Sequence, residues 1–243
     1  MILEIDVGNT RTKWRIKDQQ RIVLRGVQAT ADISNALQID MSVAADLSSA
    51  VMSCVANCQL RNGIIRQLET RFGIKTKIAV VSERVGSVEC GYETFGALGI
   101  DRWLAILAGF QRIAGAMVVI DAGSALTVDF VDKLGKHKGG YIVPGISMMR
   151  DSLSKGAEGI RLCSCADDDP RVPGFNTVEA VFKGCLLSSV SLIKYLSEDQ
   201  SSTLVLTGGD AKLLLQYLGH SPVYVEDLVL EGLSVAGVQF KTL

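Results

Sequence analysis

The chain has 243 residues, with 25 lysines and arginines against 26 aspartates and glutamates, and a formal net charge of -1. A chain of this length forms one or two domains with an ordinary core, and its 48% hydrophobic and 21% charged residues are typical of a folded protein. The balanced charge lacks the basic surface that DNA or RNA binding needs, so we expect no nucleic acid partner.

We also expect no membrane association, because no stretch supplies the roughly 20 apolar residues of a bilayer span. The chain opens with the acidic, strand-like run Ile2–Asp6 and shows no secretory signal, which indicates a cytoplasmic location. The six cysteines form no CxxC pair, and we expect reduced thiols rather than zinc ligands or disulfides. The aspartates at 167–169, just before Pro170, are interpreted as a solvated turn.

Hydrophobic periodicity predicts the secondary structure in chain order. In the first half we expect strands over 2–7, 12–17, 21–27, 50–55 and 77–81 and a helix over 60–72; residues 28–48 stay ambiguous between helix and loop. In the second half we expect helices over 101–114, 146–153, 177–196, 211–218 and 228–240 and strands over 116–120, 125–131, 138–143, 203–206 and 223–225. This mixture predicts an α/β fold.

One pattern occurs twice. Asp6-Val7-Gly8-Asn9-Thr10-Arg11-Thr12 and Asp121-Ala122-Gly123-Ser124-Ala125-Leu126-Thr127 share the form D-x-G-[N/S]-x-x-T, and each copy follows an apolar strand. The spacing indicates duplication of a whole domain rather than a short repeat.

The repeated segment has the chemistry of an anion-binding hairpin. Glycine lets the backbone approach a ligand, the following amides and hydroxyls can donate to phosphate, and the aspartate can hold a cation beside it. The alternative is a pair of ordinary turns, in which Asp and Gly are common. A third segment, Thr207-Gly208-Gly209-Asp210, joins a strand to a helix and would leave room for a nucleotide.

The chain resembles the superfamily of sugar kinases, heat-shock chaperone ATPases and actin, and within it the type III pantothenate kinases. Besides the three segments above, the resemblance rests on Gly99-Ile100-Asp101-Arg102, Gly139-Gly140-Tyr141-Ile142-Val143-Pro144-Gly145 and Asn176-Thr177. It implies two actin-like (ribonuclease H-like) α/β domains related by internal duplication, over 1–115 and 116–243, with a nucleotide cleft between them.

The resemblance also implies a function, the ATP-dependent phosphorylation of pantothenate to 4'-phosphopantothenate at the start of coenzyme A synthesis by a homodimer. It assigns ATP contacts to Asp6, Val7, Gly8, Asn9, Thr10, Arg11, Thr12, Lys13 and Ser124. It assigns pantothenate contacts to Tyr92, Gly99, Ile100, Asp101, Arg102 and Thr177. Asp101 is implied as the proton acceptor and Asp121 as a ligand of a monovalent cation, K⁺ or NH₄⁺.

General chemistry supports these roles and leaves alternatives open. A primary alcohol barely ionises at neutral pH, so a carboxylate such as Asp101 can accept its proton while the new P–O bond forms, and Mg²⁺ offsets the phosphoryl charge. Asp101 could instead be a helix cap, Arg102 a surface ion pair and Tyr92 simple packing. The competing functions are a non-catalytic nucleotide-binding regulator of the same fold and a kinase of another small alcohol.

Overall fold

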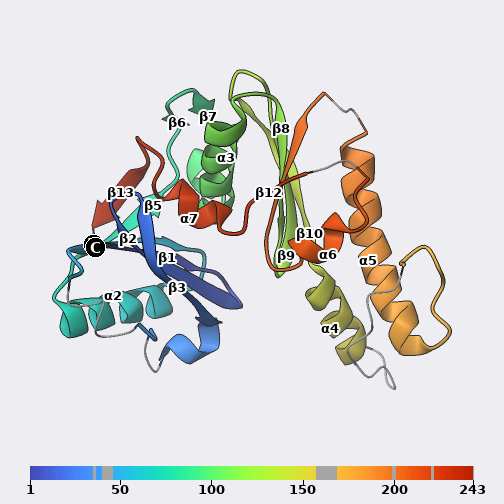
Figure 1. The fold of residues 1–243 in the computed structure, drawn as a ribbon, viewed down its shortest axis with the longest axis horizontal. Coiled ribbons are helices and arrows are strands. Elements are labelled where there is room, and N and C mark those ends of the chain that lie inside the picture. The colour runs from blue at the N-terminus through green and yellow to red at the C-terminus, as the bar shows by residue number, and fades with distance from the viewer. Residues whose placement is uncertain (35–36, 40–45, 157–168, 199–200, 220–221, 243) are drawn as a thin grey trace. The chain divides into compact units, whose positions relative to one another are not determined.

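The computed structural model describes residues 1–34, 37–39, 46–156, 169–198, 201–219 and 222–242 (Figure 1). The chain divides into two compact units. The first contains residues 1–111 together with 228–243, and the second contains residues 112–227.

The first unit is built on a six-stranded sheet with the order β13-β5-β4-β1-β2-β3. Strands β1, β2 and β3 are antiparallel neighbours, β1, β4 and β5 run parallel, and β13 pairs antiparallel with β5 at the edge. The strands span Ile2–Val7 (β1), Arg11–Asp18 (β2), Arg21–Ala29 (β3), Ser49–Cys54 (β4), Thr76–Val80 (β5) and Gln239–Thr242 (β13).

Alternation along β1 separates the two faces of this sheet. Leu3, Ile5 and Val7 are fully buried on one face, where they pack with the apolar side of helix α2 (Cys58–Phe72). Glu4 and Asp6 point to the other face, where helix α7 (Leu228–Gly232) contacts β1 and also touches helix α3 (Ile100–Ile113) (Figure 1).

Helix α2 has a cap at each end, and several short elements complete the first unit. Helix α2 begins at the cap Asn57, whose side chain accepts from Leu60 N, and ends at Gly73 with φ 66°. The remaining pieces are the 3-10 turns η1 (Thr30–Ser34) and η2 (Phe95–Ala97) and the small hairpin of β6 (Arg84–Val85) and β7 (Val88–Glu89).

The second unit has a five-stranded sheet with the order β10-β9-β8-β11-β12. Its strands are β8 (Met117–Ala122), β9 (Ala125–Val131), β10 (His137–Pro144), β11 (Thr203–Thr207) and β12 (Val223–Tyr224). Helices α4 (Ile146–Gly156), α5 (Thr177–Leu196) and α6 (Ala211–Leu215) share one apolar core with one face of this sheet.

The two sheets repeat one topology. In each, the first three strands of the unit form an antiparallel meander, and two later strands add in parallel on the other side of the first strand. Strands β1 to β5 therefore correspond to β8 to β12 in order and direction. The α/β fold and the internal duplication expected from the repeated motif are confirmed at the level of strand connectivity.

The C-terminal segment differs from the sequence prediction. A single helix was expected over 228–240, but α7 ends at Gly232 and β13 follows, because Gly237 takes φ 93° and the last strand finds a partner in β5. This pairing also places residues 228–243 in the first unit, whereas the predicted division assigned 116–243 to the second domain. Among the described residues, no helix has the length and apolarity needed to cross a membrane.

Candidate functional site

The first glycine hairpin joins β1 to β2. Val7 pairs with Thr12, and Gly8 N donates to Arg11 O at 3.1 Å across the turn. A Cβ at residue 8 would lie 2.9 Å from that same carbonyl oxygen, so only glycine fits without a shift of the backbone. The close approach of the two strands at this turn therefore explains why residue 8 is a glycine.

Thr30, which directly follows β3 as the first residue of η1, holds this hairpin in place. Its hydroxyl donates to Gly8 O at 2.8 Å and lies 3.0 Å from the hydroxyl of Thr12, and its N–H donates to Thr10 O at 2.9 Å. The role of Thr30 was not predicted, since the strand expected over 21–27 ended before it. A contact between two buried hydroxyl groups of this kind cannot be recognised from the sequence of either segment alone.

The predicted ATP contacts of the first hairpin fall into three classes by exposure. Asn9, Thr10 and Arg11 are exposed at the tip of the hairpin, and Asp6, Gly8 and Lys13 are partly buried. Val7 and Thr12 are fully buried, so their side chains support the hairpin from inside. Contacts to phosphate would come from the exposed tip and from the backbone.

The second glycine hairpin joins β8 to β9. Ala122 pairs with Leu126, Gly123 N donates to Ala125 O at 3.0 Å, and Gly145 N donates to Ser124 O at 2.9 Å. A Cβ on Gly145 would lie 2.2 Å from Gly123 O. The segment 139–145, one of those on which the family resemblance rests, therefore ends in contact with the turn that carries Ser124.

The Gly208-Gly209 segment reaches the same hairpin. Asp210 N donates to Ala122 O at 2.9 Å, and Gly208 has φ 101°. A Cβ at residue 208 would lie 2.4 Å from Ala122 O and 2.5 Å from Asp121 Oδ1. The second unit thus brings Asp121, Ser124 and the third predicted segment together at the ends of β8 and β11.

The two hairpins are not identical in register. Four residues separate the paired Val7 and Thr12, whereas three separate the paired Ala122 and Leu126. Thr127 consequently pairs with Asp121 and shares its face of the sheet, while Thr12 faces away from Asp6. The aspartates and glycines of the repeat correspond in space, but the final threonines do not.

A second group of predicted residues gathers at the start of α3. Asp101 lies in the first turn, where its Oδ1 accepts from Arg102 N at 2.8 Å and would be 2.6 Å from a Cβ at Gly99. Arg102 is 6% exposed, and its Nη1 donates to the Tyr92 hydroxyl at 2.9 Å, with its guanidinium 5.7 Å from the centre of the Tyr92 ring. Arg102 is therefore not a surface ion pair, and Tyr92 is more than packing.

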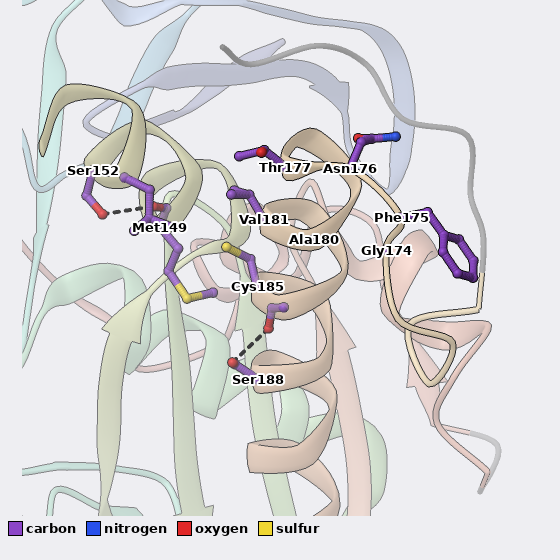
Figure 2. Close-up of a pocket in the computed structure, with 12 residues that line it drawn as sticks. Met149, Ser152, Gly174, Phe175, Asn176, Thr177, Ala180, Val181, Cys185 and Ser188 are labelled. Atoms are coloured by element: carbon purple, nitrogen blue, oxygen red, sulfur yellow. Dashed lines mark hydrogen bonds between the residues drawn. The ribbon is translucent and has the colours of Figure 1, made fainter. Parts of the chain in front are cut away.

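Thr177, the remaining predicted substrate contact, belongs to the second unit. It is exposed in the first turn of α5, on the rim of an open groove of about 810 Å³ between α4 and α5 (Figure 2). Small side chains of α5, Ala180, Gly184 and Ser188, form much of one wall, and Met149 lies on the other side.

The start of α5 is held by a reciprocal cap. Asn176 Oδ1 accepts from Glu179 N at 3.0 Å, and the Glu179 carboxylate accepts from Phe175 N at 3.0 Å and from Asn176 Nδ2 at 2.6 Å. The hydrogen bond from Phe175 N, followed by that from Asn176, lowers the pKa of Glu179. This cap fixes the helix turn that presents Thr177.

The oxygen atoms near Asp121 are of the kind that bind hard cations together with the oxygens of a phosphate group. Among the described residues, no cluster of three or more His, Cys, Asp or Glu side chains is found. Asp121 Oδ1 and the backbone oxygen of Ala122 both lie close to Gly208, and carboxylate and carbonyl oxygens are the ligands that hard cations take. Mg²⁺ commonly uses one or two carboxylates plus phosphate oxygens, a pattern that fits such a sparse carboxylate set.

Within the part of the chain that the structure describes, the other polar candidates form no common site. Cys54, Cys58, Cys90 and Cys185 are free thiols, while Cys163, Cys165, Asp167 and Asp168 lie outside the described residues. Asp169 pairs with Arg171 at 2.7 Å on the surface, and this partner lowers the pKa of Asp169 to about 2. His137 is buried with its Nε2 2.9 Å from Asp129 Oδ1, and His220 also lies outside the described residues.

Comparisons with known proteins agree with one family. A family model described as type III pantothenate kinase matches residues 2–199. A type III pantothenate kinase of Pseudomonas fluorescens (strain SBW25) is 34% identical over 255 residues, covering 97% of this chain and 98% of that protein.

Two solved structures show the fold. A Campylobacter jejuni protein described as a Baf family transcriptional activator aligns with a TM-score of 0.62 and 22% identity, over 96% of this chain and 95% of its own. A Sinorhizobium meliloti protein described as a 2-dehydro-3-deoxygalactonokinase gives a TM-score of 0.54 and 12% identity, over 96% of this chain and 97% of its own. These likenesses show that the fold is shared with both proteins, and they say nothing about chemistry.

Proposed function

The chain belongs to the type III pantothenate kinase family, and from this premise we propose that it transfers the γ-phosphoryl group of ATP to the primary hydroxyl of pantothenate, yielding 4'-phosphopantothenate for coenzyme A synthesis. The observation that carries the proposal is the likeness over nearly the full length, because the relative is similar across both units and not only in the nucleotide hairpins.

Asp101 is proposed as the proton acceptor. Its carboxylate lies at the start of α3, next to a glycine that leaves the backbone open, and it is tied to the N–H of Arg102. As the pantothenate oxygen attacks phosphorus, its proton moves to Asp101, and the P–O bond to ADP breaks. The buried guanidinium of Arg102, which donates to the Tyr92 hydroxyl, is proposed to pair with the pantothenate carboxylate.

The glycine hairpins are proposed to bind ATP. The exposed tip of the first hairpin, Asn9 to Arg11, and the half-buried Ser124 of the second offer amide and hydroxyl donors for phosphate oxygens. Asp121 is proposed to hold K⁺ or NH₄⁺, with Mg²⁺ bound mainly through the phosphates. A divalent ion, when bound, offsets the charge of the transferred phosphoryl group.

Two finer statements also belong to the proposal. The enzyme is proposed to act as a homodimer in the cytoplasm. Thr177, on the second unit, is proposed as a further pantothenate contact, since it is exposed on a helix turn that a cap holds in place.

The test is a coupled assay for ADP release with MgATP and K⁺, run with pantothenate and, in parallel, with sugars and other small alcohols. We expect turnover with pantothenate and a phosphorylated product of the corresponding mass. Turnover only with another alcohol would replace the substrate, and nucleotide binding without any turnover would favour the regulatory alternative. That alternative gives no reason for a carboxylate beside a buried Arg–Tyr pair.

A further inference from the structure

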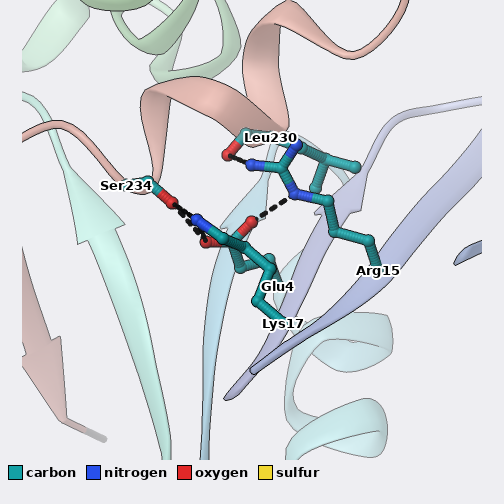
Figure 3. Close-up of polar contacts among 5 residues, drawn as sticks. All are labelled: Glu4, Arg15, Lys17, Leu230 and Ser234. Atoms are coloured by element: carbon teal, nitrogen blue, oxygen red, sulfur yellow. Dashed lines mark hydrogen bonds and ion pairs between the residues drawn. The ribbon is translucent and has the colours of Figure 1, made fainter. Parts of the chain in front are cut away.

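A buried ionic cluster lies on the face of the first sheet that carries Asp6. Arg15 Nε is 2.5 Å from Glu4 Oε2, and the side chains of both residues are 5% exposed (Figure 3). These two residues pair directly across β1 and β2. Charges this deeply buried are destabilising unless their hydrogen-bonding capacity is satisfied, so their remaining partners matter.

Those partners come from the C-terminal end of the described chain. Arg15 Nη2 donates to Leu230 O at 3.0 Å, and Ser234 Oγ donates to Glu4 Oε1 at 2.5 Å (Figure 3). Lys17 Nζ in turn donates to Ser234 Oγ at 2.8 Å and lies 3.7 Å from Glu4 Oε1. Both Glu4 oxygens are therefore used, and residues 228–234, which we name the C-terminal bracket, complete the cluster.

The bracket also contacts helix α3, which carries the proposed proton acceptor Asp101. A Cβ on Gly232 would lie 2.3 Å from Leu104 O and 2.6 Å from Leu104 Cβ. Leu104 stands three residues after Asp101, which is about one helical turn. Glycine at 232 thus permits backbone contact with the turn that follows the carboxylate.

The bracket also contacts the two strands that carry the first glycine hairpin, residues 8–11, which we call the ATP hairpin. Glu4 and Arg15 are the residues two positions outside Asp6 and Lys13, and the four form consecutive same-face pairs on β1 and β2. Two strand residues span roughly 7 Å, so the buried cluster fixes the strands immediately below the proposed phosphate contacts.

We propose that the C-terminal bracket is a positioning element, with Glu4, Arg15, Gly232 and Ser234 as positioning residues that set the placement of Asp101 relative to the ATP hairpin. This inference rests on the proposed function. Since the hairpin and α3 each keep their own ligand contacts when the bracket loosens, loss of positioning should lower kcat while both KM values change little.

Three variants test the bracket in different ways. Gly232→Ala inserts a methyl group against Leu104, and Ser234→Ala removes one hydrogen bond to Glu4. In the double variant Glu4→Gln, Arg15→Met both charges are removed together, because removing one alone would leave an unpaired buried charge and could prevent folding. Gly63→Ala is the matched control, since a Cβ there meets nothing within 4 Å and the residue lies on α2, on the opposite face of the sheet.

The experiment measures kcat and both KM values per folded molecule, well below the thermal midpoint, with hydrogen exchange followed by mass spectrometry as a readout independent of activity. For Gly232→Ala and the double variant we expect kcat to fall about tenfold or more, because small misplacements of reacting groups are costly. Exchange should rise together in residues 8–11 and 100–104. Ser234→Ala should show a smaller change in the same direction, and Gly63→Ala no change.

Unchanged kcat in folded variants, with only a lower thermal midpoint and faster exchange confined to 228–242, would overturn the positioning role and leave a purely stabilising one. If Gly232→Ala does not fold, the other two variants still decide. If the wild-type protein does not phosphorylate pantothenate, the proposed function fails, whereas joint exchange of the hairpin and the α3 turn still tests the bracket separately.

Discussion

Asp101 is the residue whose chemistry can be tested most directly. We expect Asp101→Asn to bind ATP normally and to lose about 100-fold or more in kcat, the usual contribution of general base catalysis. The amide oxygen of asparagine can still accept from Arg102 N, so the start of α3 should be preserved. ATP binding by calorimetry and turnover by the coupled assay measure the two effects.

Asp18→Asn is the control for that substitution, because Asp18 is an exposed aspartate of the same unit at the far end of β2. It should leave kcat unchanged. Full turnover in Asp101→Asn would remove Asp101 from proton transfer and return it to the role of a helix-start residue.

Gly208 gives a prediction about backbone conformation. In Gly208→Ala the new Cβ would meet both Ala122 O and Asp121 Oδ1 at a φ of 101°, so we expect a loss of more than about 1 kcal/mol in the free energy of unfolding. Urea unfolding measures it. Gly184→Ala, inside α5 with open space around it, should instead gain about 0.5–1 kcal/mol. An unchanged free energy of unfolding in Gly208→Ala would contradict the close backbone approach at this glycine.

At the scale of the element, α5 should lose its cap in acid. The folded-state pKa of Glu179 lies below its ordinary value of 4.5, so its contribution to stability is complete above that value and is lost as the pH falls through the folded-state pKa. Glu179→Gln should therefore be less stable than the wild type near neutral pH, and the difference should shrink as the pH falls below 4.5 and through the folded-state pKa.

Urea midpoints of both proteins across this pH range provide the measurement. Glu198→Gln, which removes a carboxylate just beyond the other end of α5, serves as the control and should not show the same convergence. A difference between wild type and Glu179→Gln that stays constant with pH would mean that the carboxylate charge does not support the cap.

Elements with strong local signals were predictable from the sequence. Helix α5 matches its predicted range of 177–196 because its apolar spacing, the cap at Asn176 and the polar end all agree. The strands of both hairpins follow from apolar runs that end at Asp-x-Gly. The one-residue difference between the hairpins was not predictable, because the motif records spacing along the chain and not which residues pair across the turn.

The site was predictable in part, for similar reasons. The resemblance grouped Tyr92 with Arg102, and the structure joins them by a hydrogen bond across an irregular segment whose path no periodicity describes. Thr30, Gly145 and the C-terminal bracket depend on contacts between residues distant in sequence. Their own segments carry no local sign of those contacts.

At the scale of the whole molecule, the cation requirement is open to test. With Asp121 as the proposed ligand of K⁺, we expect replacement of K⁺ by Na⁺ to slow turnover, because the fit of a cation site depends on the size of the ion. Asp121→Asn should be slow in either salt. Equal rates in both salts for the wild type would remove the cation role from Asp121. Steady-state rates at fixed ionic strength are the measurement, with Asp18→Asn again as control.

The chain leaves the first unit at residue 111, builds the second, and returns at residue 228 to add α7 and the edge strand β13. During synthesis, the amino-terminal half emerges from the ribosome with β5 as an unpaired sheet edge. At that stage Glu4 and Arg15 also lack their hydrogen bonds to Ser234 and Leu230. A chain cut short before residue 228 would lack both β13 and the C-terminal bracket, so we expect it to aggregate through the open edge of β5 rather than to fold as a smaller domain.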